Sequence, residues 1–259
     1  MSTKDLDLSL NNTSSDSPIS DMNIFQTPQA GSFLSLSKED EQEIDAFVSQ
    51  IDITDSVLVF NYGENCRAKI AALYSSVFNC FNQKDYSYIK DYISQVEKLL
   101  TDFSIGKPVK KNSFLSKYQF LKTKSSVHKI ANELDSQQLI LMHDNDVLSK
   151  FDSNLNELYK TITKYIVAGE KRLEQVKTDI LPMLKQNLDV SIASTEEYNR
   201  MVQYVNTFEQ KLYSLSTSKE IALQLIAQIN IILKNNTILI ETIKETINST
   251  IPAWENSFN

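Results

Sequence analysis

The sequence predicts an all-α fold, arranged as an elongated bundle of long antiparallel helices that pack like a coiled coil. Only four glycines and five prolines interrupt the 259 residues, so the elements should be few and long. Apolar residues recur in steps of three and four along most of the second half of the chain, which is the spacing of one face of an α-helix. An apolar content of 41% is enough for a buried core.

The first part of the chain is predicted to contain a tail and then short helices. Residues 1–36 are rich in Ser, Asn and Asp and show no periodicity, which is typical of a disordered tail. We expect helical structure over residues 37–259. Residues 37–104 should form the shorter helices, the first of them capped by Ser37 and acidic in its first turn. Gly63 is expected to loosen one of these helices.

Two long helices are predicted in the remainder of the chain. The first covers residues 127–188, with Pro182 bending or breaking its last turns. The second covers residues 195–250, and its apolar face is wider than a two-helix seam needs, so it should contact more than one neighbour. The most apolar run, at residues 221–233, is short of the about 20 residues that span a bilayer, so we predict no transmembrane helix.

Composition narrows the classes of function. A net charge of −7 argues against general DNA or RNA binding, which needs a basic surface. The N-terminus lacks a basic segment followed by an apolar one, so the sequence predicts no secretory signal and a cytoplasmic protein with reduced cysteines. Its scattered glycines form no phosphate-binding loop, and no cofactor is expected.

Candidate chemistry is sparse. His128 and His143 are far apart along one helix, so they cannot share a metal ion within the chain. The run from His143 to Asp146 has metal-binding residue types, but neighbours on a helix splay around its axis, which favours a solvated polar patch. Cys66 has no histidine near it in sequence to act as a base. The sequence therefore predicts no catalytic and no metal site.

Residues 105–126 are predicted to be a basic connection. No acid occurs between Asp102 and Glu133, whereas aromatic residues alternate with lysines there. One interpretation is a solvated connection with two aromatics tucked into the bundle. The other is attraction to an anionic surface such as lipid headgroups, worth about 1 kcal/mol per lysine near a membrane. The second gives a set of surface-contact candidates: Lys107, Lys110, Lys111, Lys117, Lys122 and Lys124, with Lys129 beyond them.

Trp254 is the only tryptophan, and it follows Pro252 near the end of the second long helix. It continues the apolar face of that helix past the point where the proline is expected to interrupt it. Burial at the end of the bundle is the ordinary role of such a residue. The alternative is that Trp254 anchors a partner protein.

Several strings, taken in order, resemble the toxic anion resistance (TelA) family of bacterial proteins. They are "VLVFNYGENCRAKI", "YIVAGEKRLEQVKTDILPML", "TFEQKLYSLSTSKEIALQLIAQINIILKNN" and "TINSTIPAW". The likeness runs from about residue 50 to the C-terminus and depends on the following residues: Tyr165, Ala168, Gly169, Glu170, Leu173, Glu174, Leu181, Pro182, Phe208, Glu209, Ala222, Leu223, Gln228, Ile229, Asn235, Asn236, Thr250, Ile251, Pro252 and Trp254.

The sequence departs from this family in three places. Residues 227–230 read Ala-Gln-Ile-Asn where such proteins usually have a proline followed by Gln-Ile-Arg. The N-terminal tail has no counterpart. The family normally continues into further helices after the tryptophan, so the resemblance implies that part of the apolar face is left uncovered here, which favours oligomerisation.

The resemblance implies a non-enzymatic bacterial helper in resistance to tellurite and envelope stress. We expect it to act through contacts with proteins or with the inner face of the membrane, because two separated cysteines do not support tellurite reduction. Self-association through the long helices is a further expectation. The alternatives are a coiled-coil scaffold with no anion-specific role and, with less support, a metal-handling protein or enzyme that uses His143.

Overall fold

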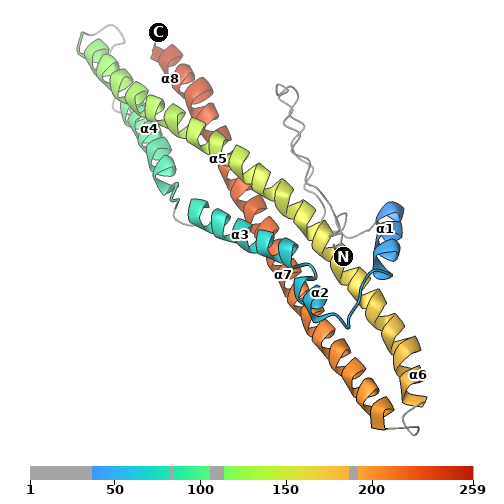
Figure 1. Ribbon diagram of the computed structural model, residues 1–259. Helices are drawn as coiled ribbons and strands as arrows, with labels where there is room; N and C mark the ends of the chain where they lie inside the picture. Colours follow the sequence, from blue (N-terminus) through green and yellow to red (C-terminus); the bar gives the residue numbers. More distant parts are fainter. Residues whose placement is uncertain (1–36, 82–83, 106–113, 187–191, 259) are drawn as a thin grey trace. The chain divides into compact units, whose positions relative to one another are not determined.

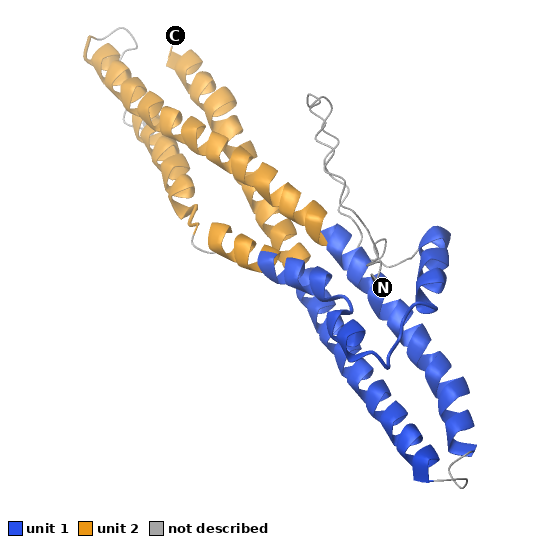
Figure 2. Cartoon of the chain, viewed as in Figure 1, with its two compact units in different colours: residues 1–72, 156–223 blue, residues 73–155, 224–259 orange. Residues whose placement is uncertain are grey.

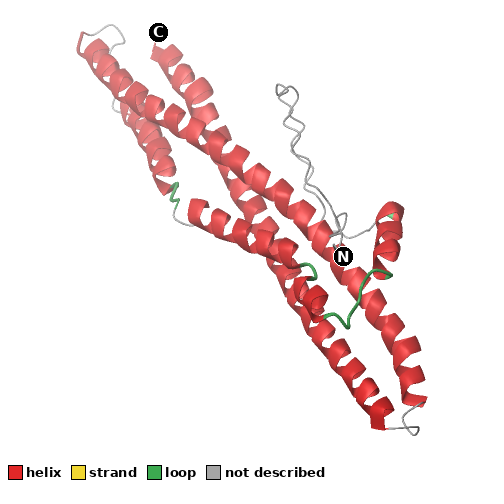
Figure 3. Cartoon of the chain, viewed as in Figure 1, coloured by secondary structure: helices red, strands yellow, loops and turns green. Residues whose placement is uncertain are grey.

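The protein is helical apart from short connections in the computed structural model, which describes residues 37–81, 84–105, 114–186 and 192–258 (Figure 3). The predicted all-α class is confirmed, and the described residues contain no strand. The chain divides into two compact units, coloured in Figure 2. Unit 1 comprises residues 1–72 and 156–223, and unit 2 comprises residues 73–155 and 224–259.

The elements follow one another as labelled in Figure 1. In chain order they are α1 (Lys38–Val48), α2 (Ser56–Asn61), α3 (Glu64–Phe81), α4 (Ser87–Ile105), α5 (Phe114–Gln175), a π-helical turn (Val176–Ile180), α6 (Leu181–Gln186), α7 (Ile192–Glu245), a second π-helical turn (Thr246–Thr250) and α8 (Ile251–Phe258). The division into units falls inside α3, α5 and α7.

The first long helix begins earlier than predicted. Residues 114–126 were expected in a connection, but they form the first turns of α5. Helical periodicity is present there, since Ser116, Phe120 and Val127 lie on one buried face. The intervening lysines and serines hide it in the sequence. Residues 1–36 and the rest of the predicted connection, residues 106–113, lie outside the described residues.

Both prolines at the ends of the long helices are accommodated by π-helical turns. Pro182 and Pro252 are each the second residue after such a turn, and the residue before each donates its N–H to the carbonyl five positions back. Proline has no N–H, and its ring clashes with the carbonyl four residues earlier, so a wider turn relieves the conflict. The α-helix is thus interrupted locally ahead of each proline, and helix continues beyond both.

In unit 1 the short helices pack around an aromatic cluster. Tyr62 is buried, and its hydroxyl donates a hydrogen bond of 2.7 Å to the carbonyl of Tyr165. The Tyr62 ring meets those of Tyr165 and Phe208 edge-on, with centroids 5.2 and 5.0 Å away, and stacks near Phe47 at 6.1 Å. Burial raises the pKa of Tyr62. The cluster joins α1, α5 and α7 to the residue that follows α2.

Two glycines allow close packing in unit 1. Gly63 has a φ of 65°, a left-handed conformation that L side chains rarely adopt, so it lets the chain turn between α2 and α3. Gly169 lies on α5 against α7, where a Cβ atom would lie 2.4 Å from Cδ2 of Leu212. Gly63 was expected to loosen one helix, and in the structure it lies between two separate helices, α2 and α3.

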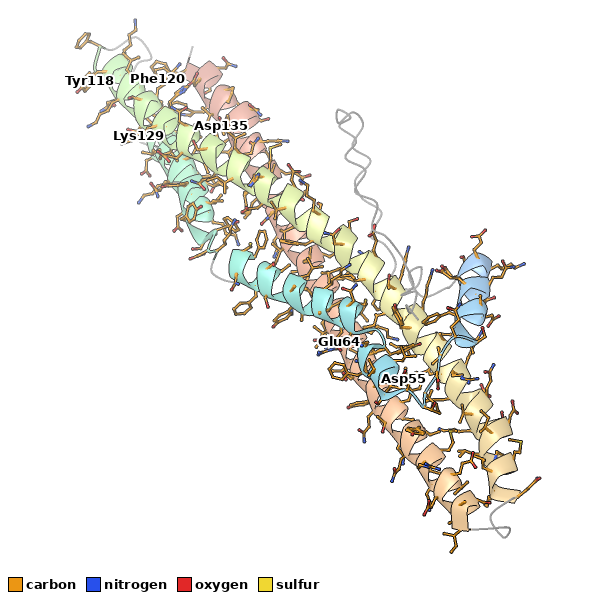
Figure 4. The ribbon with its side chains drawn as sticks, viewed as in Figure 1. Asp55, Glu64, Tyr118, Phe120, Lys129 and Asp135 are labelled. Atoms are coloured by element: carbon orange, nitrogen blue, oxygen red, sulfur yellow. The ribbon has the colours of Figure 1, made fainter. Side chains whose placement is uncertain are left out.

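Charged side chains tie the surface helices of unit 1 to the long ones. Lys164 on α5 bonds Asp40 and Glu43 of α1, both at 2.6 Å. Lys211 on α7 donates to the Glu64 carboxylate at 2.9 Å and to the Phe60 carbonyl of α2 at 2.6 Å. Asp55, which like Glu64 is labelled in Figure 4, caps the start of α2.

In unit 2, α4, the first part of α5 and the last part of α7 bury one apolar core that α8 completes. Its fully covered members come from α4, α5 and α7, and on α4 and α5 they recur every seven residues, as predicted for a coiled-coil-like seam. They include Ile89, Val96, Val127, Leu134, Leu141 and Ile243.

Candidate functional site

The acid-free start of α5, at the end of unit 2, is the most distinctive charged surface of the described chain. Of the predicted surface-contact lysines, Lys107, Lys110 and Lys111 lie outside the described residues. Lys117 and Lys122 are exposed, and so is Lys129, which is labelled in Figure 4. No acid occurs between Phe114 and Glu133, so this part of the helix carries positive charge only.

Lys124 behaves differently from its neighbours. Its ammonium group lies 3.0 Å from Glu255 of α8, and His128 contacts the other carboxylate oxygen at 2.7 Å. Burial opposes ionisation of Glu255, but hydrogen bonds from His128 and Lys124 outweigh it, and the pKa of Glu255 is lowered. Lys124 thus serves to hold α8, which reduces its part in any surface contact.

The aromatic residues of this region divide between the two interpretations. Phe103 and Phe120 are packed into the core of unit 2, as expected for a solvated connection with tucked aromatics. Phe114 and Tyr118 are 89% and 61% exposed, as expected for a surface that contacts something else. Leu115 and Leu121 are exposed as well, and the sequence analysis did not single them out.

The spacing of these exposed apolar residues along the sequence could have identified them as a group. Phe114, Tyr118 and Leu121 lie four and three residues apart, so they share one face of a helix. That pattern has meaning only once the helix is known to begin at Phe114 rather than near Val127. We call Phe114, Leu115, Tyr118 and Leu121 the apolar ridge.

Trp254 is buried in unit 2, with 8% of its surface exposed. Its ring lies 5.3 Å from that of Phe103 and 5.1 Å from that of Phe120, which in turn stacks on Phe258 at 4.1 Å. The indole N–H has no hydrogen-bond partner in the described residues. A role as a partner anchor stays a prediction, and it would require the indole to leave this cluster.

The run from His143 to Asp146 is solvated only in part, since His143 and Asp146 are exposed whereas Asp144 is buried. Asp144 is only 4% exposed and accepts hydrogen bonds from Lys84 and the hydroxyl of Tyr86. Burial and this bond raise the pKa of Tyr86. Asn145 accepts a bond of 2.9 Å from the buried Asn236 of α7. Asp144 thus links α5 to the α3–α4 connection, and Asn145 links α5 to α7. Helical spacing alone could not predict these contacts.

Neither cysteine belongs to a metal-binding cluster in the part of the chain that the structure describes. Cys66 is buried, its thiol donates to the carbonyl of Leu158 at 3.4 Å, and burial raises its pKa to about 11, so it is a poor nucleophile. Cys80 is exposed. Within the described ranges, no three His, Cys, Asp or Glu side chains converge in a way that could hold a metal ion.

An open apolar groove lies between α3 and α7 in unit 2. It has a volume of about 210 Å³ and is lined mainly by Tyr74, Phe78, Phe81, Leu225 and Ile232. A second groove of about 550 Å³ adjoins it, and its lining includes Lys84, Lys90, Asn235 and Asn236.

One helical run, Ile192–Phe258, is long and apolar enough to cross a membrane by length and composition. Core helices of soluble proteins meet the same two requirements, so this carries little weight. The finding nevertheless differs from the expectation of no such helix. Exposed isoleucines, Ile231 and Ile238, contribute to its apolar character.

Together these features define a class: an all-helical protein whose long antiparallel helices are joined by buried aromatic and polar contacts. The chain belongs to the toxic anion resistance protein (TelA) family, which matches residues 44–259. The predicted resemblance is confirmed. Several residues that carried it make interhelical contacts here, namely Tyr165, Gly169, Phe208, Glu209, Asn236 and Trp254.

Bacterial relatives are distant. The chain is 27% identical over 240 residues to the uncharacterized protein YaaN of Bacillus subtilis, covering 85% of this chain and 62% of YaaN. It is 25% identical to Lmo1967 of Listeria monocytogenes, covering 80% and 56%. It is 24% identical to a TelA-like protein of Staphylococcus epidermidis, covering 86% and 64%. The chain thus spans less than two thirds of these relatives. No solved structure matches it.

Proposed function

We propose that this chain is a non-enzymatic helper in bacterial resistance to toxic anions such as tellurite and to envelope stress. It acts by contact, from the cytoplasm, at the anionic inner face of the membrane. The observation that carries the proposal is the acid-free start of α5, where Lys117, Lys122 and Lys129 are exposed in a chain whose net charge is −7. Each such lysine near an anionic membrane contributes about 1 kcal/mol.

Action through surface contacts also fits the structural roles of the buried ionisable groups. Asp144 is engaged by Lys84 and Tyr86, and the thiol of Cys66 donates to a backbone carbonyl. These groups join helices to one another. Family membership supports the link to toxic anions through the family's name.

The proposal is tested by growth of a strain that lacks the gene, with and without the 259-residue chain. Tellurite and several unrelated envelope-targeting antibiotics form the challenge. We expect sensitivity to both kinds of agent, rescued by the wild-type chain and not by Lys117→Glu/Lys122→Glu. The matched control is Lys150→Glu/Lys160→Glu, which reverses two exposed lysines elsewhere on α5 and should still rescue. Equal rescue by both double variants would contradict membrane-surface contact.

A second candidate is a scaffold that pairs with another copy of itself. It is favoured by the apolar groove of unit 2 and by the exposed Ile231 and Ile238 on α7. Sedimentation velocity should then give a dimer that Ile231→Glu/Ile238→Glu converts to a monomer. A wild-type chain that sediments as a monomer at all concentrations would remove this candidate.

A further inference from the structure

We propose that the apolar ridge at the start of α5 inserts into the interfacial region of a lipid bilayer. This inference rests on the proposed function and deepens it, because it adds a hydrophobic anchor to an electrostatic attraction. Its members are Phe114, Leu115, Tyr118 and Leu121, which are 89%, 59%, 61% and 63% exposed. All belong to the described part of unit 2.

Among the described residues of unit 2, the ridge side chains stay exposed and are not part of the apolar core. The buried face of this part of α5 contains Ser116, Phe120 and Val127. At 3.6 residues per turn, the ridge lies roughly 150° around the helix from that face. Figure 4 labels Tyr118 and Phe120 near the start of α5, and the Phe120 ring lies 5.1 Å from that of Trp254 in α8. These four large apolar side chains lie opposite the buried face of α5 and form one exposed patch. Contiguous exposed apolar patches mark interaction sites.

The charges beside the ridge fit anionic lipid. Lys117 and Lys122 flank it, and Lys129 follows on the same side two turns later. Lysines and aromatic residues beside apolar ones are typical of helices that lie in the headgroup region, with the apolar face about 5–10 Å deep. Long lysine side chains can extend back to the phosphates while the ridge is immersed.

The same charges disfavour a second copy of the chain as the occupant. In a symmetric dimer the same patch forms both halves of the contact. Such a dimer through the ridge would bring Lys117 and Lys122 close to their own counterparts, with no acid on this part of α5 to compensate. Like charges at an interface are repulsive. A lipid surface provides the opposite sign over its whole area.

The first test measures binding of the full 259-residue chain to vesicles. Phosphatidylcholine vesicles with and without phosphatidylglycerol are compared, at low salt and at about 1 M salt, where the Debye length is about 3 Å. The ridge variant is Phe114→Ser/Leu121→Ser. The matched control is Met183→Ser/Tyr213→Ser, which removes two similarly exposed apolar side chains from unit 1. Circular dichroism confirms that each variant is folded.

We expect the wild-type chain to bind vesicles that contain phosphatidylglycerol and to keep part of this binding at high salt. The ridge variant should bind at least about tenfold more weakly and lose the salt-resistant part, because two large apolar side chains no longer leave water. The control variant should bind as the wild type does. Equal binding by the ridge variant, or complete loss of wild-type binding at high salt, would overturn insertion while leaving surface contact standing.

Depth is measured directly with one tryptophan. Tyr118→Trp is placed in a Trp254→Phe background, so that all tryptophan emission comes from the ridge. Insertion predicts a blue shift on binding and quenching by brominated lipids, whereas an unchanged, unquenched emission from bound protein would refute it. No binding of the wild-type chain to any vesicle would remove both the inference and the membrane-surface function.

Discussion

At Gly169 a single hydrogen atom determines how closely α5 and α7 can lie in unit 1. Alanine favours a helix over glycine by about 0.8–1.0 kcal/mol. Its Cβ would, however, lie 2.4 and 3.1 Å from the two Cδ atoms of Leu212, and overpacking of this kind costs about 1–3 kcal/mol. The clash should therefore prevail. We expect Gly169→Ala to lower the free energy of unfolding by about 1 kcal/mol, measured by urea denaturation.

The control for this prediction is a background in which the effect of Gly169→Ala on stability should change sign. In a Leu212→Ala background the clashing atoms are absent, so only the helix propensity of alanine remains. Gly169→Ala should then be neutral or stabilising, although Leu212→Ala is itself destabilising. If the substitution has the same effect in both backgrounds, the close approach of the two residues is not its cause.

Also at the scale of single residues, Asp40 should make the stability of unit 1 depend on pH. Hydrogen bonds from Lys164 and from the backbone and side chain of Ser37 lower the pKa of its carboxyl group from 3.8 to about 2. A carboxyl whose pKa is lower in the folded than in the unfolded chain stabilises the fold above the unfolded value. This contribution should decline as the pH falls from about 3.8 to about 2.

An NMR titration of the Asp40 carboxyl group, with unfolding measured over the same pH range, checks this expectation. Lys164→Met removes the hydrogen bond that Lys164 donates and should raise the pKa of Asp40 toward its ordinary value. The variant should also lose part of the pH dependence. An Asp40 pKa that is the same in both proteins would contradict the role given to Lys164.

At the scale of elements, α8 is held to unit 2 by aromatic packing. Trp254→Ala should lower the free energy of unfolding by about 3–5 kcal/mol, since it empties a site between Phe103 and Phe120. Trp254→Phe should cost clearly less, because it keeps an aromatic ring and removes an indole N–H that has no partner in the described residues. Chemical denaturation followed by circular dichroism compares the two. Equal losses would mean that ring packing is not what holds α8.

The connection between α3 and α4 should depend on the buried carboxylate of Asp144. Lys84→Met leaves that carboxylate with Tyr86 as its remaining donor among those described, and we expect a loss of about 1–3 kcal/mol. Replacing both partners, as Lys84→Met/Asp144→Leu, should recover part of the loss, since no charge is then left buried. A double variant that is less stable than the single one would show that the pair is not coupled in this way.

For the whole molecule, we expect no specific binding of divalent metal ions. In the described ranges no three potential ligands converge, and Asp144, from the run His143 to Asp146 that has metal-binding residue types, is used in a structural contact. Calorimetric titration with zinc, calcium and magnesium should give no saturable heat. Saturable binding that is abolished by His143→Ala would revive the metal-handling alternative.

Also for the whole molecule, much of the architecture could be predicted from periodicity. The steps of three and four residues predicted both long helices, because helices pack through one face and that face must be apolar. Boundaries were less accurate. Periodicity predicts a connection over residues 105–126, whereas α5 begins at Phe114, and at the two prolines the helices widen into π-helical turns and continue.

The candidate site was predictable in charge but not in geometry. The acid-free lysine stretch is visible in the sequence, whereas the pairing of Lys124 with Glu255 joins residues far apart in the chain. The ridge was missed for a related reason. Whether Phe114 or Phe120 is buried depends on which face of α5 meets its neighbours in unit 2, and this in turn depends on where the helix begins.

The sequence by itself determined the helical class, the long antiparallel helices, the acidic net charge and the family, since each depends on composition, local spacing or the order of strings along the chain. Only the tertiary structure decided which side chains are buried and which remain exposed to solvent. It placed Trp254 and Asp144 in the interior of unit 2 and left Phe114 and Tyr118 in solvent. The physical reason is that burial is a property of neighbours, and neighbours from distant segments are set by packing.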